Sequence, residues 1–309
     1  MDEFALIARI RERLQTADPR VRVGVGDDAA VLAPSAGCAV LSVDAVVEGA
    51  HFDRRWLSWP DVGWRGVAGA LSDLAAMRAA PVCALLSMVL PEDLAGDDAL
   101  AIVDGAAEAA RAHGASIVGG NLARGPVVSL HTTVMGEAPS PLGRGGARPG
   151  DGVFVTGTLG AAALGWRLLA KDAEAQGPFV RRWRRPRARF DALPWLAAAT
   201  ACVDVSDGFA QDLGHVCEAS EVGAEIDLAA LPVAPDHATV AAASGHDPHL
   251  LAATGGEDYE LIFTAPAPPA PSSADVTRVG TIIEGAGVRF TAPDGTPWSP
   301  PAAGHRHFR

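Results

Sequence analysis

The sequence lacks long apolar runs and has few cysteines, and both absences restrict its class. No run of about 18 apolar residues, the length of a membrane-spanning helix, occurs. The first residues, Met1-Asp2-Glu3, are acidic where a secretory signal is basic, so we expect a cytoplasmic protein without a membrane partner. No cysteine belongs to a C-x-x-C pair, which argues against a disulfide framework or a zinc site, and we expect all of them to be small core residues. They are Cys38, Cys83, Cys202 and Cys217.

Basic charge is scarce as well. The chain has 25 Lys and Arg against 37 Asp and Glu, a formal net charge of −12. A general nucleic-acid binder needs a basic face that releases phosphate counterions, so we expect no nucleic-acid partner. Residues 181–189 form one basic cluster around Trp183. It has two interpretations, a site for phosphate or RNA and a solvated helix end with arginine stems packed on the indole, and we favour the second.

A length of 309 residues and a hydrophobic content of 49% suit one large or two ordinary domains, and we expect two. Residues 139–150 are rich in proline and glycine, so we place a linker there between domains of residues 1–138 and 151–309. Apolar spacing in the first domain predicts an α+β fold with a mixed sheet. The expected helices are 3–15, 58–78 and 97–113, and the expected strands are 39–44, 81–90, 115–118 and 127–137.

The second domain continues with strands and helices. Residues 153–160 predict a strand that runs through a glycine turn into a helix over 161–170, and the turn lacks the Gly-Lys-Ser/Thr end of a Walker A loop. A short strand begins at residue 201. Further helices are expected near 190–200 and over 207–219, and further strands over 261–264, 278–283 and 287–291.

Two adjacent carboxylates, Asp27 and Asp28, lie on a glycine-rich turn that begins at Gly24. Adjacent carboxylates repel each other, so they are either exposed to water or neutralised by a cation such as Mg²⁺ or Ca²⁺. Taken alone, the solvated turn is the simpler interpretation. The positions of other acids favour the cation.

These other acids lie near strand ends, in a helix and on a second glycine turn. Asp44 ends the strand over 39–44, and the neighbours of Asp73 in its helix leave both a solvent-facing and an inward orientation open. Asp204 comes late in an apolar strand, where an acid needs a partner. Asp207 starts the next helix, either as an N-cap or as a ligand, and Glu257 follows two glycines.

Several carboxylates without a Cys/His ligand set indicate a hard cation. Mg²⁺ prefers oxygen ligands and usually binds substrate phosphates at the same time. Phosphoryl transfer or nucleotide hydrolysis is therefore the expected chemistry, because positioning and charge neutralisation supply most of its rate.

The acids belong to longer motifs, which follow one another along nearly the whole chain. They are Gly26-Asp27-Asp28, Ser42-Val43-Asp44, Glu48-Gly49-Ala50-His51-Phe52, Leu71-Ser72-Asp73-Leu74-Ala75-Ala76-Met77, Gly119-Gly120-Asn121, Arg148-Pro149-Gly150-Asp151, Val155-Thr156-Gly157-Thr158-Leu159-Gly160, Asp204-Val205-Ser206-Asp207-Gly208 and Gly255-Gly256-Glu257-Asp258-Tyr259-Glu260-Leu261. In this order they resemble the motifs of the thiamine-monophosphate kinase family. The wider aminoimidazole ribonucleotide synthetase-like superfamily shares the architecture but not, as a set, the His-Phe and Gly-Gly-Glu-Asp-Tyr signatures.

This resemblance implies a two-domain fold and a reaction. The amino-terminal α+β domain would dimerise through its mixed sheet, giving a homodimer, and the carboxyl-terminal domain would be α/β. ATP would bind with several Mg²⁺ ions in a cleft near the dimer interface. Its γ-phosphate would pass directly, in line, to the phosphate of thiamine monophosphate, giving thiamine diphosphate and ADP.

The resemblance also implies roles for individual residues. The metal ligands would be Asp28, Asp44, Asp73, Asn121, Asp204 and Asp207, with Asp27 and Ser42 beside them. Of these, Asp44, Asp73 and Asp207 would be the catalytic acids. The ATP contacts would be Gly120, Asn121, Arg144 and Ser206, and the thiamine-phosphate contacts would be His51, Glu257 and Phe308.

Some features leave alternatives open. His51 has a second interpretation as a general base, but a phosphate monoester is already ionised near neutral pH and needs little base, so we favour a substrate contact. Relatives often continue the Gly-Gly motif as Asp-Thr, whereas this chain has Asn121-Leu122-Ala123, and its tail lacks the usual Trp and Tyr. The alternative functions are another ATP-dependent reaction of the superfamily and a non-catalytic nucleotide or thiamine-phosphate sensor.

Overall fold

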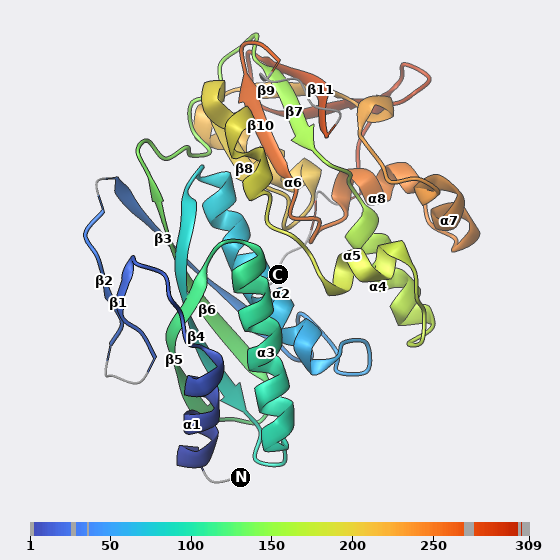
Figure 1. Cartoon of the computed structure of the whole chain (residues 1–309). Helices are drawn as coiled ribbons and strands as arrows, with labels where there is room; N and C mark the ends of the chain where they lie inside the picture. Colours follow the sequence, from blue (N-terminus) through green and yellow to red (C-terminus); the bar gives the residue numbers. More distant parts are fainter. Residues whose placement is uncertain (1–2, 26–28, 36, 269–274, 302–303, 305–309) are drawn as a thin grey trace. The chain divides into compact units, whose positions relative to one another are not determined.

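The computed structural model describes residues 3–25, 29–35, 37–268, 275–301 and 304. The chain divides into two compact units (Figure 1). Unit 1 consists of Met1–Leu74 and Ala79–Pro141, and unit 2 consists of Ala75–Arg78 and Leu142–Arg309. Among the described helices, none combines the length and the apolar composition that crossing a membrane requires.

Unit 1 contains a four-stranded sheet in the order β3-β6-β4-β5. The β4–β5 pair is parallel, whereas β3–β6 and β4–β6 are antiparallel. A short antiparallel pair, β1–β2, lies outside this sheet. The elements are α1 Glu3–Arg13, β1 Val21–Val23, β2 Val31–Leu32, β3 Cys38–Val47, α2 Trp59–Ala76, β4 Ala80–Leu90, α3 Gly96–Ala112, β5 Ser116–Arg124 and β6 Ser129–Ala138.

The two faces of this sheet differ. Alternate side chains of β6, such as Leu130 and Val134, are 0% exposed, and Gly66 of α2 lies against Leu130. Small residues let the helices approach closely, since a Cβ on Gly63 of α2 or Gly105 of α3 would lie 1.9 Å from the backbone oxygen of the opposite helix. On the other face, Leu41, Val43 and Leu85 remain 65%, 66% and 41% exposed.

Unit 2 contains a seven-stranded sheet in the order β13-β12-β9-β11-β7-β10-β8. Its pairs are antiparallel except β12–β9. The strands are β7 Gly152–Thr156, β8 Ala201–Asp204, β9 Gly223–Asp227, β10 Leu261–Ala265, β11 Val276–Ile283, β12 Gly287–Thr291 and β13 Pro297–Trp298. The helices are α4 Ala161–Lys171, α5 Pro178–Arg184, α6 Phe209–Ser220, α7 His237–Ala243 and α8 Pro248–Thr254, with 3-10 helices η1 Phe190–Ala198 and η2 Leu228–Ala230.

Each face of this sheet has its own apolar core. Phe209 and Leu213 of α6 pack with Val203 and Ile262 on one face. On the other, η1 packs around the stacked rings of Phe154 and Phe263, together with Ala75 and Ala76 of α2, which explains why the end of this helix groups with unit 2. Helices α4, α5, α7 and α8 share a third, smaller cluster of side chains.

Several sequence-based expectations differ from the observed elements. Strand β5 continues through residues 119–121, beyond the expected strand end at residue 118, and Asp44 lies inside β3 rather than at its end. The helix expected near 190–200 is a 3-10 helix that contains Pro194, which removes a backbone donor. Cys38 is exposed, so it is not a core residue, whereas the three other cysteines are buried as expected.

Candidate active site

In unit 1, Ser42 and Asp44 occupy the same face of β3 because alternate side chains of a strand point the same way. The Ser42 hydroxyl donates a hydrogen bond to the Asp73 carboxylate of α2. Asp44 accepts a hydrogen bond from the amide of Ala45 at 2.7 Å. All three polar side chains are half-buried. Asp73 is therefore turned toward β3, which resolves the orientation that its neighbours left open.

Gly120 and Asn121 are exposed on the edge strand β5. A Cβ on Gly120 would lie 1.9 Å from the backbone oxygen of Leu86, so glycine is needed for the close pairing of β5 with β4. Both residues line a groove of about 1520 Å³ in unit 1, whose other walls include Ile7 of α1 and Leu41 of β3. A groove of this size has room for a nucleotide.

His51 accepts a hydrogen bond at Nδ1 from the backbone amide of Val47, at 3.1 Å. This bond places the proton of a neutral ring on Nε2, so Nε2 is a donor. Nearby, Glu48 binds Arg54 and accepts a hydrogen bond from the amide of Val128, and the Arg54 guanidinium lowers the pKa of this carboxyl. The loop that carries His51 is thus fixed to the sheet.

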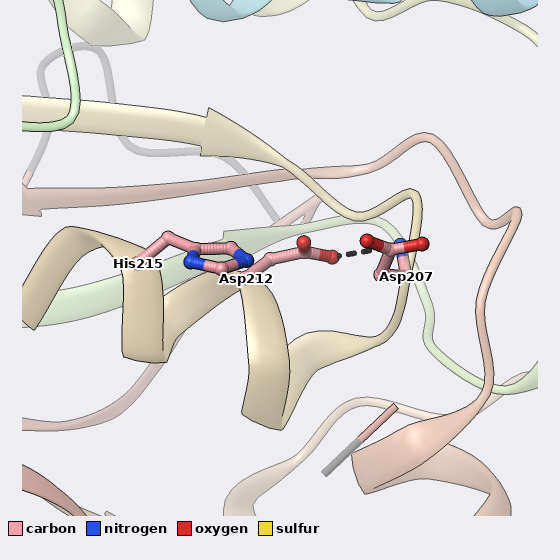
Figure 2. Close-up of side chains that lie close together, drawn as sticks. All are labelled: Asp207, Asp212 and His215. Carbon is pink, nitrogen blue, oxygen red and sulfur yellow. Dashed lines mark hydrogen bonds between the residues drawn. The ribbon is translucent and has the colours of Figure 1, made fainter. Parts of the chain in front are cut away.

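In unit 2, Asp204 is 5% exposed at the end of β8, and Ser206 and Asp207 follow it. Helix α6 begins only at Phe209 after Gly208, so Asp207 is not its N-cap. The side chain of Asp212 performs the capping, because it accepts hydrogen bonds from the amides of Ser206, Asp207 and Gly208 at 3.0 to 3.1 Å. Figure 2 shows the bond from Asp207. Asp207 instead accepts a bond from Gln211 at 2.8 Å.

Asp212 was missed by the motif comparison. One ligand atom each of Asp207, Asp212 and His215 lie within 4.8 Å of one another (Figure 2). Burial raises the pKa of Asp212 to about 7, and the nearby charges of Asp204 and Asp207 add to this effect. The signal available in the sequence was an acid in the first turn of the helix that follows the Asp-Gly dipeptide.

The turn over residues 255–260 packs directly on this acidic segment. The Glu257 amide donates to the carbonyl of Ser206 at 2.8 Å, and the Tyr259 amide donates to that of Val205 at 2.9 Å. A Cβ on Gly256 would lie 2.4 Å from the Ser206 oxygen, which explains the glycine. Glu257 and Ser206, two of the expected site residues, are therefore brought together by the backbone.

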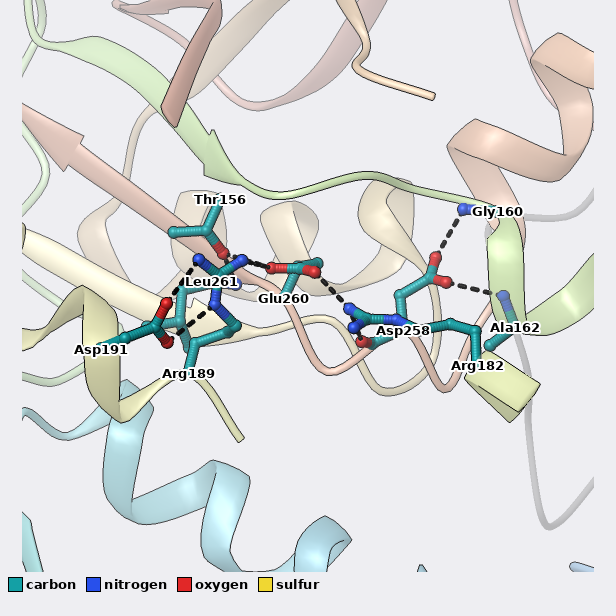
Figure 3. Close-up of polar contacts among 9 residues, drawn as sticks. All are labelled: Thr156, Gly160, Ala162, Arg182, Arg189, Asp191, Asp258, Glu260 and Leu261. Carbon is teal, nitrogen blue, oxygen red and sulfur yellow. Dashed lines mark hydrogen bonds and ion pairs between the residues drawn. The ribbon is translucent and has the colours of Figure 1, made fainter. Parts of the chain in front are cut away.

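Part of the basic cluster is not a solvated helix end. Arg182 and Arg189 form ion pairs with Glu260, which is 2% exposed (Figure 3). Trp183 is 1% exposed, and its indole donates to Glu257 at 2.7 Å. Part of the cluster thus stabilises the turn over residues 255–260, and Trp183 is a second residue that the motif comparison missed.

The remaining expected site residues are placed as follows. Arg144 is exposed, and its carbonyl accepts a hydrogen bond from the Ser220 hydroxyl at 3.0 Å. Asp27, Asp28 and Phe308 lie outside the described residues.

Comparisons with known proteins agree with this two-unit arrangement. Family models described as AIR synthase related protein, N-terminal domain, and AIR synthase related protein, C-terminal domain, match residues 26–138 and 148–291. The chain therefore belongs to the AIR synthase related proteins, and the expected two-domain fold with mixed sheets is confirmed.

Individual relatives narrow the family. The thiamine-monophosphate kinase of Aquifex aeolicus is 34% identical over 294 residues, which cover 93% of this chain and 94% of the relative. That of Escherichia coli K12 is 38% identical over 282 residues, which cover 85% of this chain and 82% of the relative. The chain belongs to the thiamine-monophosphate kinase family, so both the resemblance seen in the motifs and the expected phosphotransferase class are confirmed.

Solved structures agree. Thiamine-monophosphate kinase from Stenotrophomonas maltophilia K279a aligns with a TM-score of 0.82 at 36% identity, over 96% of this chain and 98% of that one. A structure of AaThiL complexed with AMPPCP and TMP aligns with a TM-score of 0.81 at 33% identity, over 98% and 97% of the two chains. E. coli HypE, a hydrogenase maturation protein, has a TM-score of 0.77 at 21% identity over 99% and 98%, which shows the shared fold alone.

Proposed function

We propose that this chain phosphorylates thiamine monophosphate with ATP, giving thiamine diphosphate and ADP. The observation that carries the proposal is the match to thiamine-monophosphate kinases along almost the whole chain, at 34% identity over 93% of its length for one of them. A relative of known structure, aligned over 98% of this chain, holds AMPPCP together with TMP, so ATP is the phosphoryl donor that fits the family.

The side chains described above fit a hard cation. Ser42, Asp44 and Asp73 in unit 1 present hydroxyl and carboxylate oxygens, and the Ser42–Asp73 hydrogen bond already holds two of these groups in contact. In unit 2, Asp204 and Asp207 lie in a segment whose amides are bound by Asp212. We propose these five side chains, with Asn121, Asp27 and Asp28, as ligands of several Mg²⁺ ions. Mg²⁺ bound there would offset the repulsion between the two phosphate-bearing substrates.

The protein groups position the substrates and supply donors. We propose Gly120, Asn121, Arg144 and Ser206 as ATP contacts, and the groove beside Gly120 and Asn121 supports a nucleotide in unit 1. His51 would donate from Nε2 to the phosphate of thiamine monophosphate, because its Nδ1 is occupied by the amide of Val47.

Direct in-line transfer needs no covalent intermediate on the protein. The acceptor is a phosphate monoester that is already ionised near neutral pH, so no general base has to remove a proton before attack. An in-line geometry requires the two phosphates to be held close and aligned, which is the role of the positioning residues. Glu257 and Phe308 are proposed to contact the thiamine moiety.

We also propose that the chain is a homodimer that pairs through the four-stranded sheet of unit 1. The face of this sheet opposite α2 exposes Leu41, Val43 and Leu85 by 65%, 66% and 41%. Three large apolar side chains on a single open face are typical of an interface rather than of solvated surface.

One coupled measurement tests the reaction. The purified protein is incubated with ATP, Mg²⁺ and thiamine monophosphate, and the products are separated by chromatography. We expect thiamine diphosphate and ADP in equal amounts. Formation of ADP only with another acceptor would point to a different superfamily reaction, and binding of both substrates without product would point to a sensor.

A further inference from the structure

The turn that carries Glu257 adopts a demanding backbone conformation. Glu257 and Tyr259 have φ angles of 65° and 51°, in the left-handed region that residues with a Cβ rarely occupy. Between and after them, Asp258 and Glu260 are 0% and 2% exposed, whereas Glu257 and Tyr259 are half-buried. The side chains therefore alternate, with one pair directed into unit 2 and the other pair nearer its surface.

The inward pair fixes the backbone of the turn (Figure 3). Asp258 accepts hydrogen bonds from the amides of Gly160 and Ala162 at the start of α4. Glu260 binds Arg182 and Arg189 and accepts a hydrogen bond from the Thr156 hydroxyl at 2.7 Å. These contacts explain how the strained turn is maintained, but they do not orient the side chain of Glu257.

The side chain of Glu257 is oriented by Trp183. The indole Nε1 of Trp183 donates to Oε2 of Glu257 at 2.7 Å. Trp183 is 1% exposed on α5, so the ring is held by packing and keeps its donor in one place. The indole is uncharged, and for this reason it directs the carboxylate without adding a positive charge beside it.

A carboxylate directed in this way suits the thiamine moiety. Thiamine has a positively charged thiazolium ring and an aminopyrimidine, and a carboxylate attracts the first and accepts hydrogen bonds from the second. An arginine or lysine in place of Trp183 would add a competing cation next to Glu257. The indole N–H donates a hydrogen bond without adding such a cation.

We propose that Trp183 is a positioning residue that sets the affinity for the thiamine moiety by orienting Glu257. The inference rests on the proposed function, because the proposed function names thiamine monophosphate as the substrate that Glu257 contacts. It gives α5 a role in specificity, although the indole itself is buried and does not touch the substrate. A purely structural role for Trp183 would instead change thermal stability and leave the KM for thiamine monophosphate unaltered.

The test is a double-mutant cycle with Trp183→Phe and Glu257→Gln, measured by steady-state kinetics with each substrate varied in turn. Trp183→Phe removes the N–H but keeps an aromatic ring. We expect each single variant to raise the KM for thiamine monophosphate about 10-fold and to leave kcat and the KM for ATP within about 2-fold. The double variant should lose no more than either single variant, because both remove the same interaction. Trp195→Phe is the matched control, because Trp195 is a half-buried indole of η1 that packs against an apolar cluster. It should leave kcat and both KM values unchanged.

The outcomes separate the inference from the function. If the wild-type protein makes thiamine diphosphate and Trp183→Phe keeps its KM for thiamine monophosphate, the inference is wrong and the function stands. Losses that multiply in the double variant would also overturn it. If Trp183→Phe does not fold, the calorimetric Kd for thiamine monophosphate of Glu257→Gln decides, and an unchanged Kd overturns the inference. A wild-type protein that neither binds nor phosphorylates thiamine monophosphate overturns both.

Discussion

At the scale of single residues, the acids of unit 2 have different tasks although they lie close together. Asp212 and Asp258 each bind backbone amides at the start of a helix, α6 and α4. Asp207 lies beside the amides that Asp212 holds but makes its own bond to a side chain, that of Gln211. The capping acids thus maintain the backbone, and Asp204 and Asp207 are the two acids of this segment that we propose as metal ligands.

We therefore expect Asp207→Asn to abolish turnover without unfolding the protein. The substitution keeps the size of the side chain but removes the charge of a proposed metal ligand, so kcat should fall about 100-fold or more. Product formation at saturating Mg²⁺ and the thermal unfolding midpoint are the two measurements. Asp236→Asn is the matched control, because Asp236 is exposed at a φ of 62° that asparagine also tolerates. Near-normal turnover of Asp207→Asn would show that Asp207 does not bind the metal.

Asp258 gives a prediction about pH. Burial raises the pKa of Asp258 from 3.8 to about 7, against the lowering effect of the amides of Gly160 and Ala162. At a pH between the unfolded pKa of 3.8 and the folded pKa of about 7, the folded chain keeps a proton that the unfolded chain has released. Unfolding therefore releases a proton, and the free energy of unfolding falls as pH rises. One such group adds a slope that approaches about 1.4 kcal/mol per pH unit, and the slope vanishes above the folded pKa.

The test compares Asp258→Asn with the wild type. The variant lacks this titration. The free energy of unfolding of the wild type minus that of the variant should therefore fall as pH rises from 5 to 7 and stay constant above about 8. Denaturant unfolding at several pH values measures it, and the titration of Asp212, present in both proteins, cancels. A difference that does not vary with pH would show that Asp258 is ionised throughout.

At the scale of elements, the sequence predicts the helices and strands whose boundaries depend on apolar spacing. It misses the residues whose place depends on a close contact with the backbone of another element. Helix α3 and strand β4 lie within about one residue of their expected ends, because their apolar patterns are long. Gly120 lies beyond the strand expected over residues 115–118, yet it belongs to β5, where a Cβ would meet the backbone of β4 at 1.9 Å. Propensity alone cannot show such a contact, because the partner strand lies far along the chain.

The candidate site follows the same rule. The motif comparison supplied Ser42, Asp44 and Asp73, and the structure shows that strand periodicity puts the first two on one face of β3. Asp212 and Trp183 were missed, because their importance comes from hydrogen bonds made after α6 and α5 have packed. Roles inferred from motifs thus covered residues proposed to touch ligands, whereas the residues that hold those segments in place required the structure.

Helix packing gives the element-scale prediction. Gly105→Ala should destabilise the protein by about 1–3 kcal/mol, because its Cβ would lie 1.9 Å from the oxygen of Pro60 and force α3 away from α2. Gly214→Ala is the matched control: Gly214 lies in α6 with open space around its Cα, so alanine should stabilise the helix by about 0.5–1 kcal/mol. Urea unfolding measures both, and equal effects in the two variants would contradict the packing argument.

At the scale of the whole molecule, each unit has its own sheet and core, but among the described residues only the sheet of unit 1 has an apolar face that is left open. The faces of the unit 2 sheet are covered by α6 and by η1. In unit 1, Leu41 and Val43 extend from β3 with 65% and 66% of their surface exposed. This asymmetry supports the proposal that a second copy of the chain covers the face.

Val43→Glu, at an exposed residue of this face that does not line the groove beside Gly120, should therefore produce a monomer. A charge within an apolar interface leaves an unpaired carboxylate in each copy on association, which costs more than the contact contributes. Analytical ultracentrifugation gives the mass of wild type and variant. Val233→Glu, at a residue of unit 2 that is 41% exposed, is the matched control and should leave the mass unchanged. A monomeric wild type, or a dimeric Val43→Glu, would contradict the proposal.

The last turn of α2 has a consequence for protein engineering. Residues Ala75–Arg78 group with unit 2, although unit 1 both precedes and follows them in the chain. Consider a chimera with a single crossover at Pro141, which takes the first unit from one relative and the second unit from another. Its Ala75 and Ala76 would come from one parent, whereas the apolar core of unit 2 on which they pack would come from the other. A chimera should instead take these four residues from the parent that supplies the second unit.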